Sequence, residues 1–181
     1  TVMFSDFKGF SRISEQLDPE TLVAEIDSCF RAFDHIVEKY KLEKIKTVGD
    51  AYLCVNGINS DEDAEDAAAV IRAALEMQDF LDKRAEDRRN KDLHYFEARI
   101  GIHTGPVVAG IVGIKKFAYD IWGDTVNVAS RMETSGEAGR INISATTYQL
   151  VQHEFPCTYH GDFQENSNSI KMYWVENKVK S

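Results

Sequence analysis

The sequence has few cysteines, few prolines and no excess of basic residues, and each shortage excludes a class of protein. Its three cysteines, Cys29, Cys54 and Cys157, lack CxxC or Cys/His ligand spacing, which argues against a disulfide framework and a zinc site. A reducing, cytoplasmic compartment is the simplest expectation. Only three prolines and 11 glycines interrupt the 181 residues, with no linker or internal repeat, so we expect one domain over residues 1–181.

A net positive charge and long hydrophobic runs are also missing. The chain carries 30 acidic and 21 basic side chains, a net charge of −9, which argues against a nucleic acid polymer as ligand. Every apolar run is shorter than the roughly 20 residues of a membrane-spanning helix, so we expect no membrane contact by this chain itself. Because Thr1–Phe4 already reads as a strand, we interpret the chain as a piece of a longer protein. Regulatory domains or a membrane tether would lie outside it.

Hydrophobic periodicity predicts four helices. The clearest follows Asp18-Pro19-Glu20, which supply an N-cap, a first-turn proline and an early acid, and it ends near Tyr40. A second starts at the acids of residues 61–63 and decays into the charged stretch 82–92. Asp124 is the predicted N-cap of a third, and Ser144 of a fourth.

Strands are predicted between these helices. They cover residues 1–4, 44–47, 51–56, 93–103, 107–113 and 172–175. The order of elements predicts an α+β fold, a ferredoxin-like sandwich with helices packed on one face of a mostly antiparallel sheet. The other face would be open for a partner.

Two aspartates stand where predicted strands end in turns. Asp6 follows the opening strand, and Asp50 lies in a Gly-Asp hairpin turn. A sheet that pairs these segments would bring the two carboxylates together. Two carboxylates with open positions suit Mg²⁺ bound to a phosphate-containing substrate. Ordinary turn chemistry is the alternative explanation of both residues.

A second candidate group lies on and before the third predicted helix. Asn127 and Arg131 are four residues apart, so an amide and a guanidinium share one helix face and could converge on an anionic ligand. Asp120 stands just before the helix, where its carboxylate could accept a hydrogen bond. A solvated helix face with an ordinary cap is the alternative.

A basic cluster, Lys41, Lys44 and Lys46, interrupts the acidic trend. In an extended strand Lys44 and Lys46 share one face. Lys46 precedes Asp50 by four residues, which places it beside any phosphate or base bound there. A solvated strand is the alternative.

Together these segments resemble the class III nucleotidyl cyclase catalytic domain, the family of adenylyl and guanylyl cyclases. The resemblance rests on four blocks in the family's order, Phe4–Phe10, Lys44–Tyr52, Arg99–Gly105 and Tyr119–Met132. It implies the cyclase fold and a phosphorus–oxygen lyase that converts a nucleoside triphosphate into a 3′,5′-cyclic monophosphate and pyrophosphate.

The resemblance also implies roles for single residues. Asp6 and Asp50 would hold two Mg²⁺ or Mn²⁺ ions, Asn127 would orient the ribose, and Arg131 would stabilise charge on the α-phosphate. The family builds its sites at a head-to-tail dimer interface. One subunit would supply Asp6 and Asp50, and the other would supply Lys46, Asp120, Asn127 and Arg131. Because this chain carries both sets, the resemblance implies a homodimer with two equivalent sites.

Lys46 and Asp120 occupy the positions at which the family reads the base. Adenine offers an acceptor at N1 and a donor at its amino group, which match a lysine and a carboxylate, whereas guanine reverses that pattern. The pair therefore points to ATP and to an adenylyl cyclase. A guanylyl cyclase with relaxed base selectivity and a catalytically silent regulatory homologue are the alternatives. A diguanylate cyclase would show a different turn at residues 48–52.

One segment departs from the family. Family members usually carry a triphosphate-binding lysine in a turn before the final strand, but residues 161–170 contain no basic residue. Lys171 is the nearest one and lies inside the predicted strand. It is the candidate triphosphate ligand, and another residue could take its place.

Overall fold

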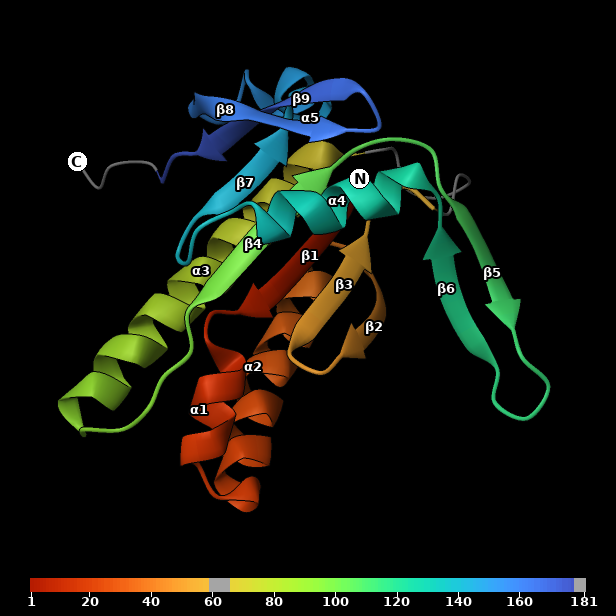
Figure 1. Cartoon of the computed structure of the whole chain (residues 1–181). Coiled ribbons are helices and arrows are strands. Elements are labelled where there is room, and N and C mark those ends of the chain that lie inside the picture. Colours follow the sequence, from red (N-terminus) through yellow and green to blue (C-terminus); the bar gives the residue numbers. More distant parts are fainter. Residues whose placement is uncertain (59–65, 178–181) are drawn as a thin grey trace.

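The computed structural model, which describes residues 1–58 and 66–177, is an α+β fold (Figure 1). Its helices are α1 (Phe10–Gln16), α2 (Pro19–Lys39), α3 (Ala67–Asn90), α4 (Asp124–Thr134) and α5 (Ala145–Val151). Its strands are β1 (Val2–Phe7), β2 (Glu43–Val48), β3 (Ala51–Val55), β4 (Ala98–His103), β5 (Val108–Val112), β6 (Ala118–Trp122), β7 (Ile141–Ser144), β8 (Cys157–Glu165) and β9 (Asn168–Val175). The predicted start of the second helix, residues 61–63, lies outside the described residues.

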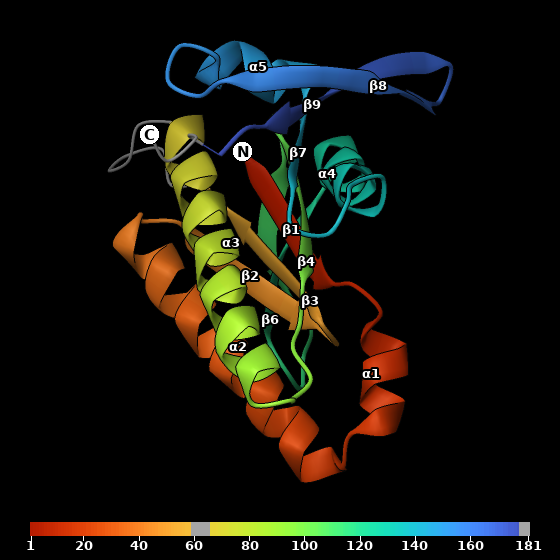
Figure 2. The ribbon, with the colours of Figure 1, turned by 90° about the vertical axis from the view of Figure 1, so that its left-hand side faces the viewer.

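Seven strands form one sheet in the order β2-β3-β1-β4-β7-β9-β8, and β5 and β6 form a separate two-stranded hairpin. The seven-stranded sheet is mostly antiparallel, as predicted, and only β4 and β7 run parallel in it. Helices α2 and α3 cover one face, while α4 and α1 lie on the other (Figure 2). The prediction that helices pack on one face alone is therefore wrong.

Gly101 of β4 explains why α4 can lie on the second face. A Cβ atom at this position would lie 2.0 Å from the backbone nitrogen of Glu133 on α4. No side chain can be accommodated at that distance, so the glycine allows the helix backbone to approach the strand directly. This contact fixes the position of the helix that carries Asn127 and Arg131.

The predicted start and end of α2 are confirmed. Asp18 is the N-cap, and its side chain accepts a hydrogen bond from the backbone N–H of Thr21 at 2.9 Å, with Pro19 as the first helical residue. Tyr40 is the C-cap. The helix buries Phe33 and its apolar neighbours against the sheet and α3, in the main hydrophobic core.

Helix α3 is longer than predicted, because the charged stretch from residue 82 does not end it. The helix continues to Asn90. Arg84 and Arg88 each place a guanidinium nitrogen 2.7 Å from Oε1 of Glu25, a buried residue of α2. These arginines pair with a buried carboxylate of the neighbouring helix, so the charged stretch faces a partner on α2 and does not end α3.

The predicted cap of α4 is shifted by one residue. Gly123, with φ of 132°, is the N-cap, and Asp124 is the first helical residue. The Gly123 carbonyl accepts from the N–H groups of Val126 and Asn127 at 3.1 and 3.4 Å. Glycine adopts this backbone conformation without strain. Asp124 still contributes a negative charge to the first turn.

Helix α1 and strands β6, β7 and β8 were not predicted. Strand β7 has four residues, all buried, and so shows no alternation of polar and apolar side chains. Strand β8 is a sheet edge in which no residue is fully buried, so it lacks an apolar pattern. The N-cap of α5 is as predicted, since the Ser144 hydroxyl accepts from the N–H of Thr147 at 3.5 Å.

Candidate active site

Asp6 and Asp50 lie close together where β1 ends and the β2–β3 turn begins. Strand β1 pairs antiparallel with β3, with Ser5 opposite Tyr52, so the turn that carries Asp50 comes beside Asp6. Asp50 Oδ2 accepts a hydrogen bond from the backbone N–H of Phe7 at 3.0 Å. Burial raises the pKa of Asp50, and the negative charge of Asp6 adds to this shift. The structure thus brings the two predicted metal ligands together.

Arg99 and Glu133 complete this group, and the sequence analysis assigned neither a role. Arg99 lies opposite Asp6 in the β1–β4 register, and its Nη2 atom is 3.2 Å from both Asp6 carboxylate oxygens. Glu133 Oε1 is buried without a hydrogen bond and lies 3.4 Å from Arg99 Nη2. Burial, followed by the neighbouring Asp6 carboxylate, raises the pKa of Glu133 to about 8. We call these four residues, Asp6, Asp50, Arg99 and Glu133, the carboxylate cluster.

A sequence signal existed for Arg99 but not for Glu133. Arg99 is a basic residue in the otherwise apolar first half of β4, and it belongs to one of the four blocks that resemble the family. Glu133 reads as an ordinary acid near a helix end. Its burial depends on the approach of α4 to β4, which no local pattern indicates.

The carboxylate cluster fits a divalent cation that takes part of its coordination from a substrate. Mg²⁺ is commonly held by one or two carboxylates together with waters and substrate phosphates. Asp6 and Asp50 supply two such groups. Within residues 1–58 and 66–177 no set of three or more histidine, cysteine, aspartate and glutamate residues could enclose a metal ion. A site completed by a nucleotide agrees with both observations.

Lys46 and Asp120 form an ion pair between β2 and the hairpin strand β6. Lys46 Nζ lies 2.7 Å from Asp120 Oδ2, although the residues are 74 positions apart. The other carboxylate oxygen of Asp120 accepts from the backbone N–H of Ile121 at 2.8 Å. The hydrogen bond from Lys46 lowers the pKa of Asp120. A cationic donor and an anionic acceptor thus stand side by side, both accessible to solvent.

The predicted sharing of one face by Lys44 and Lys46 is wrong. The register of β2 shifts between these two residues, so Lys44 lies opposite Cys54 and Lys46 opposite Leu53. Adjacent residues of β3 face opposite sides of the sheet, and the two lysines therefore do so as well. Lys44 pairs with Asp34 of α2 at 2.8 Å and is separated from the candidate site.

Helix α4 exposes Asn127 and Arg131 toward solvent. Arg131 Nη1 lies 3.3 Å from Glu165 Oε2 of β8, and the guanidinium carbon lies 5.5 Å from the centre of the Phe163 ring. Both residues lie on this 11-residue helix, four positions apart, as predicted. Glu133, on the same helix, belongs instead to the carboxylate cluster.

The adenylate and guanylate cyclase catalytic domain model matches residues 1–177 of this sequence. The chain belongs to this family. It is therefore a class III nucleotidyl cyclase catalytic domain, and the observed α+β fold is that of solved cyclase domains.

Relatives of this cyclase domain include proteins of both base specificities. The crystal structure of the adenylyl cyclase CyaB from P. aeruginosa superposes with a TM-score of 0.92 at 31% identity, covering 99% of this chain and 94% of that one. The guanylate cyclase domain of RhGC from Catenaria anguillulae, in complex with GTP, gives 0.86 at 30% identity, with 97% and 94% covered. Atrial natriuretic peptide receptor 2 of Mus musculus is 34% identical over 99% of this chain, which spans 17% of the receptor.

Lys171 of the cyclase domain is not part of the group around Arg131. It lies on β9 opposite Asp162, and its Nζ atom is 5.8 Å from the centre of the Tyr159 ring. The side chain is exposed on the outer strands of the sheet. None of its described contacts involves Asp6, Asp50 or Arg131.

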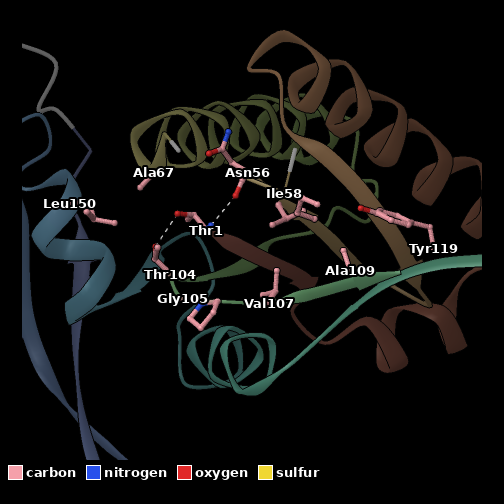
Figure 3. A pocket seen from close by; sticks show the side chains of 13 residues that line it. Thr1, Asn56, Ile58, Ala67, Thr104, Gly105, Val107, Ala109, Tyr119 and Leu150 are labelled. Carbon is pink, nitrogen blue, oxygen red and sulfur yellow. Dashed lines mark hydrogen bonds between the residues drawn. The ribbon is translucent and has the colours of Figure 1, made fainter. Parts of the chain in front are cut away.

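A cavity of about 840 Å³ lies at the opposite end of β1 from Asp6 (Figure 3). Thr1, Asn56 and Thr104 contribute polar atoms to its wall, and Val107 and Tyr119 lie on the side of the β5–β6 hairpin. It contains none of the predicted site residues. The cavity therefore lies apart from the residues that are predicted to carry the cyclase chemistry.

Among the helices in residues 1–58 and 66–177, none combines the length and the hydrophobicity that a membrane-spanning helix requires.

Proposed function

We propose that this cyclase domain is an adenylyl cyclase, which converts ATP into 3′,5′-cyclic AMP and pyrophosphate in a head-to-tail homodimer. The Lys46–Asp120 pair is the observation that carries the choice of ATP. In the proposal, residues 1–181 form one cytoplasmic domain of a longer protein whose regulatory domains lie outside this chain.

The chemistry of the Lys46–Asp120 pair supports adenine. The ammonium group of Lys46 can donate to N1, and the free lone pairs of Asp120 can accept from the exocyclic amino group. Guanine carries a donor at N1 and an acceptor at O6, so it would leave both groups without a partner. Sites that hydrogen-bond the substrate discriminate strongly against an analogue that lacks the matching group.

In the proposed reaction the ribose 3′-hydroxyl releases its proton to solvent, its oxygen forms a bond to the α-phosphorus, and the bond from that phosphorus to the bridging oxygen of pyrophosphate breaks. Asn127 orients the ribose, and Arg131 donates to the α-phosphate oxygens as charge develops. Asp6 and Asp50 would hold two Mg²⁺ or Mn²⁺ ions. When bound, these ions favour loss of the 3′-hydroxyl proton and neutralise the leaving pyrophosphate.

Arg99 is a further cation beside the proposed metal ligands. Its guanidinium is shared between Asp6 and Glu133, and its side chain is 30% exposed. It can therefore contribute positive charge near the phosphates in a chain whose residues 161–170 contain no basic group. This supports the alternative already open for the triphosphate, in which a residue other than Lys171 binds it.

The direction of side chains on α4 supports a shared site. Successive residues of an α-helix turn by about 100°, so Arg131 and Glu133 lie roughly 200° apart around the axis. Glu133 is buried in the carboxylate cluster, whereas the Arg131 side chain is 53% exposed. Arg131 is thus turned away from Asp6 of its own chain. A second copy, placed head to tail, could bring its carboxylate cluster to this arginine.

The β5–β6 hairpin offers an apolar surface for such a contact. Its exposed large apolar side chains are Val108, Ile111, Val112, Ile114, Phe117 and Trp122. The hairpin projects beside β2 and is not hydrogen-bonded into the seven-stranded sheet (Figure 1). A group of exposed apolar side chains on a projecting element favours burial by another chain.

Turnover of the purified domain with ATP and with GTP, each with Mn²⁺, tests the proposed activity. We expect cyclic AMP and pyrophosphate in equal amounts, with a higher kcat/KM for ATP. Preferred turnover of GTP would favour the guanylyl cyclase alternative. Nucleotide binding without either cyclic product would favour the silent regulatory homologue.

Mixing two inactive variants tests the shared site. Asp50→Asn and Arg131→Ala should each lower turnover at least about 10²-fold alone. In a head-to-tail dimer formed from both, one site carries both changes and the other carries none. An equal mixture should therefore recover about one quarter of the wild-type activity. Absence of recovery, with dimers present by ultracentrifugation, would contradict the proposed arrangement.

A further inference from the structure

The Arg131 side chain contacts two residues at the end of β8. Its Nη1 atom lies 3.3 Å from Glu165 Oε2, and its guanidinium carbon lies 5.5 Å from the centre of the Phe163 ring. Phe163 and Glu165 are two residues apart on one strand, so their side chains project from the same face. One strand thus offers an aromatic ring and a carboxylate to the same guanidinium.

Glu165 has no other charged partner in the described part of the chain. Its side chain is 16% exposed, and its Oε2 atom is buried without a hydrogen bond. Arg131 is the only basic residue within ion-pair distance of it among the described residues. A nearly buried carboxylate without a counter-charge is unfavourable, so this environment favours the arrangement in which Arg131 stays beside Glu165.

The contact leaves most of the arginine available. A guanidinium has five N–H donors, and Glu165 lies within ion-pair distance of Nη1 alone. The Arg131 side chain is 53% exposed. Donors that do not face Glu165 can therefore reach an incoming phosphate while the pair is kept.

The turn after β8 holds Glu165 in a defined place. Asn166 and Ser167 both have positive φ, 44° and 70°, and Glu165 lies opposite Asn168 of β9. This is the two-residue turn with left-handed central residues that matches the twist of a hairpin. Glu165 is thus the last paired residue of β8, and both strands support it.

We propose that Glu165 is a positioning residue, which holds the Arg131 guanidinium in the orientation that meets the α-phosphate. This inference rests on the proposed cyclase activity. A long, half-exposed arginine samples many rotamers, and an anchored guanidinium needs no reorganisation when charge develops on the phosphate. The segment 161–170 lacks the family's lysine, but through Glu165 it then orients Arg131 toward the α-phosphate.

A similar arrangement elsewhere in the domain offers a matched control. Arg140 Nη2 lies 3.4 Å from Glu176 Oε1, and its guanidinium carbon lies 4.3 Å from the centre of the Trp174 ring. This arginine is not a predicted site residue. Glu176→Gln therefore removes a carboxylate from an arginine stacked on an aromatic ring, as Glu165→Gln does, but away from the proposed site.

Arginine side-chain NMR and kinetics of Glu165→Gln test the proposal. In the wild type we expect slow rotation of the Arg131 guanidinium, seen as resolved Nη signals that are assigned by their loss in Arg131→Ala. In Glu165→Gln these signals should merge. The kcat should fall about tenfold with a smaller change in KM, because misplacement of a group that acts in the transition state affects the chemical step. Glu176→Gln should change neither readout.

A double-mutant cycle separates positioning from a general structural effect. In an Arg131→Lys background, Glu165→Gln should cause little further loss of kcat, since both changes act through one group. Additive losses, an unchanged or increased kcat in Glu165→Gln, or unchanged Arg131 signals would each overturn the proposal. If the wild type makes no cyclic product from ATP or GTP, the proposed function fails, and the Arg131 signals still decide whether Glu165 orients this side chain.

Discussion

The carboxylate cluster differs in its balance of charge from two ion pairs with half-exposed cations, Lys46–Asp120 and Arg131–Glu165. The cluster gathers three carboxyl groups around one guanidinium, that of Arg99. Burial raises the pKa of Asp50, whereas Lys46 lowers the pKa of Asp120.

This difference indicates what each region can bind. The cluster carries an excess of acid in a partly buried place, which a bound cation would relieve. Each ion pair is balanced in charge, with a cation whose side chain is about half accessible, 44% for Lys46 and 53% for Arg131. One region is suited to metal ions and the other to the base and phosphates of a nucleotide. The following changes test that division.

Removal of charge from the cluster should have the largest effect. Asparagine at Asp6 or Asp50 keeps the side-chain volume, and at Asp50 it keeps an oxygen that can accept from the N–H of Phe7. We expect turnover to fall at least about 10³-fold, because bound metal ions supply several kcal/mol of charge stabilisation and about 1.4 kcal/mol is a factor of ten. Steady-state rates and Mn²⁺ binding by electron paramagnetic resonance should fall together.

Asp162→Asn is the matched control for these variants. The Asp162 carboxylate accepts from Tyr159 and Ser169, each at 2.7 Å, on the outer strands, and none of its described contacts involves the carboxylate cluster. Its loss should leave turnover and Mn²⁺ binding nearly unchanged. Undiminished Mn²⁺ binding in both Asp6→Asn and Asp50→Asn would contradict the assignment of the cluster to metal ions.

Truncation of Arg131 should have the next largest effect. Arg131→Ala is expected to lower kcat by roughly 10²- to 10³-fold, the usual consequence of losing one preorganised donor to developing charge. The KM should change much less, because the interaction strengthens in the transition state. Arg140→Ala is the control. A rise in KM at unchanged kcat would assign Arg131 to ground-state binding of the phosphates instead.

Substitution of Lys46 and Asp120 should have a smaller effect than loss of Arg131, and we expect it in the preference for ATP over GTP. Lys46→Glu with Asp120→Cys replaces a donor and an acceptor by groups that suit guanine. We expect the ratio of kcat/KM for ATP to that for GTP to fall at least about tenfold. Lys44→Glu, on the other face of the sheet, serves as control. An unchanged ratio would show that Lys46 and Asp120 do not read the base.

The two regions also differ in how far the sequence predicts them. Local signals at Asp18 and Ser144 predict their helices, and the motifs indicate that Asp6 and Asp50 approach each other. Arg99 and Glu133 escape prediction because their contacts join residues far apart in the chain, 93 positions in the case of Arg99 and Asp6. Such contacts depend on strand register and helix approach, which have no local pattern.

The same reason explains two errors outside the carboxylate cluster. The end of α3 is misjudged because Glu25, the residue that pairs with its arginines, lies about 60 positions earlier. The side of the sheet that Lys44 faces is predicted wrongly, because a register shift in β2 reverses the alternation of side chains between the two faces. Motifs therefore predict the residue types of a site better than the contacts that orient them, and the Arg131–Glu165 pair is one such contact.

The smallest expected effect is on the charge of Asp120. The hydrogen bond from Lys46 places the pKa of Asp120 in the folded state below its pKa in the unfolded state. The pair therefore stabilises the fold when the pH is above the unfolded-state pKa. This contribution is lost as the pH falls through the folded-state pKa. Lys46→Met should raise the pKa of Asp120 toward its ordinary range in a carboxyl NMR titration of the metal-free domain. The free energy of unfolding near neutral pH should change by less than about 1 kcal/mol, since exposed pairs contribute little.

Asp50 provides the internal control for this titration. Its pKa is raised by burial and by Asp6, neither of which involves Lys46, so Lys46→Met should leave it in place. An Asp120 pKa that does not move would show that the 2.7 Å contact does not persist in solution. Lys46 and Asp120 would then be independent groups, and they would adopt the arrangement that matches adenine only when the nucleotide binds. A shift of Asp120 alone would instead establish a pair that is ordered before the base arrives, as we infer for Arg131 and Glu165.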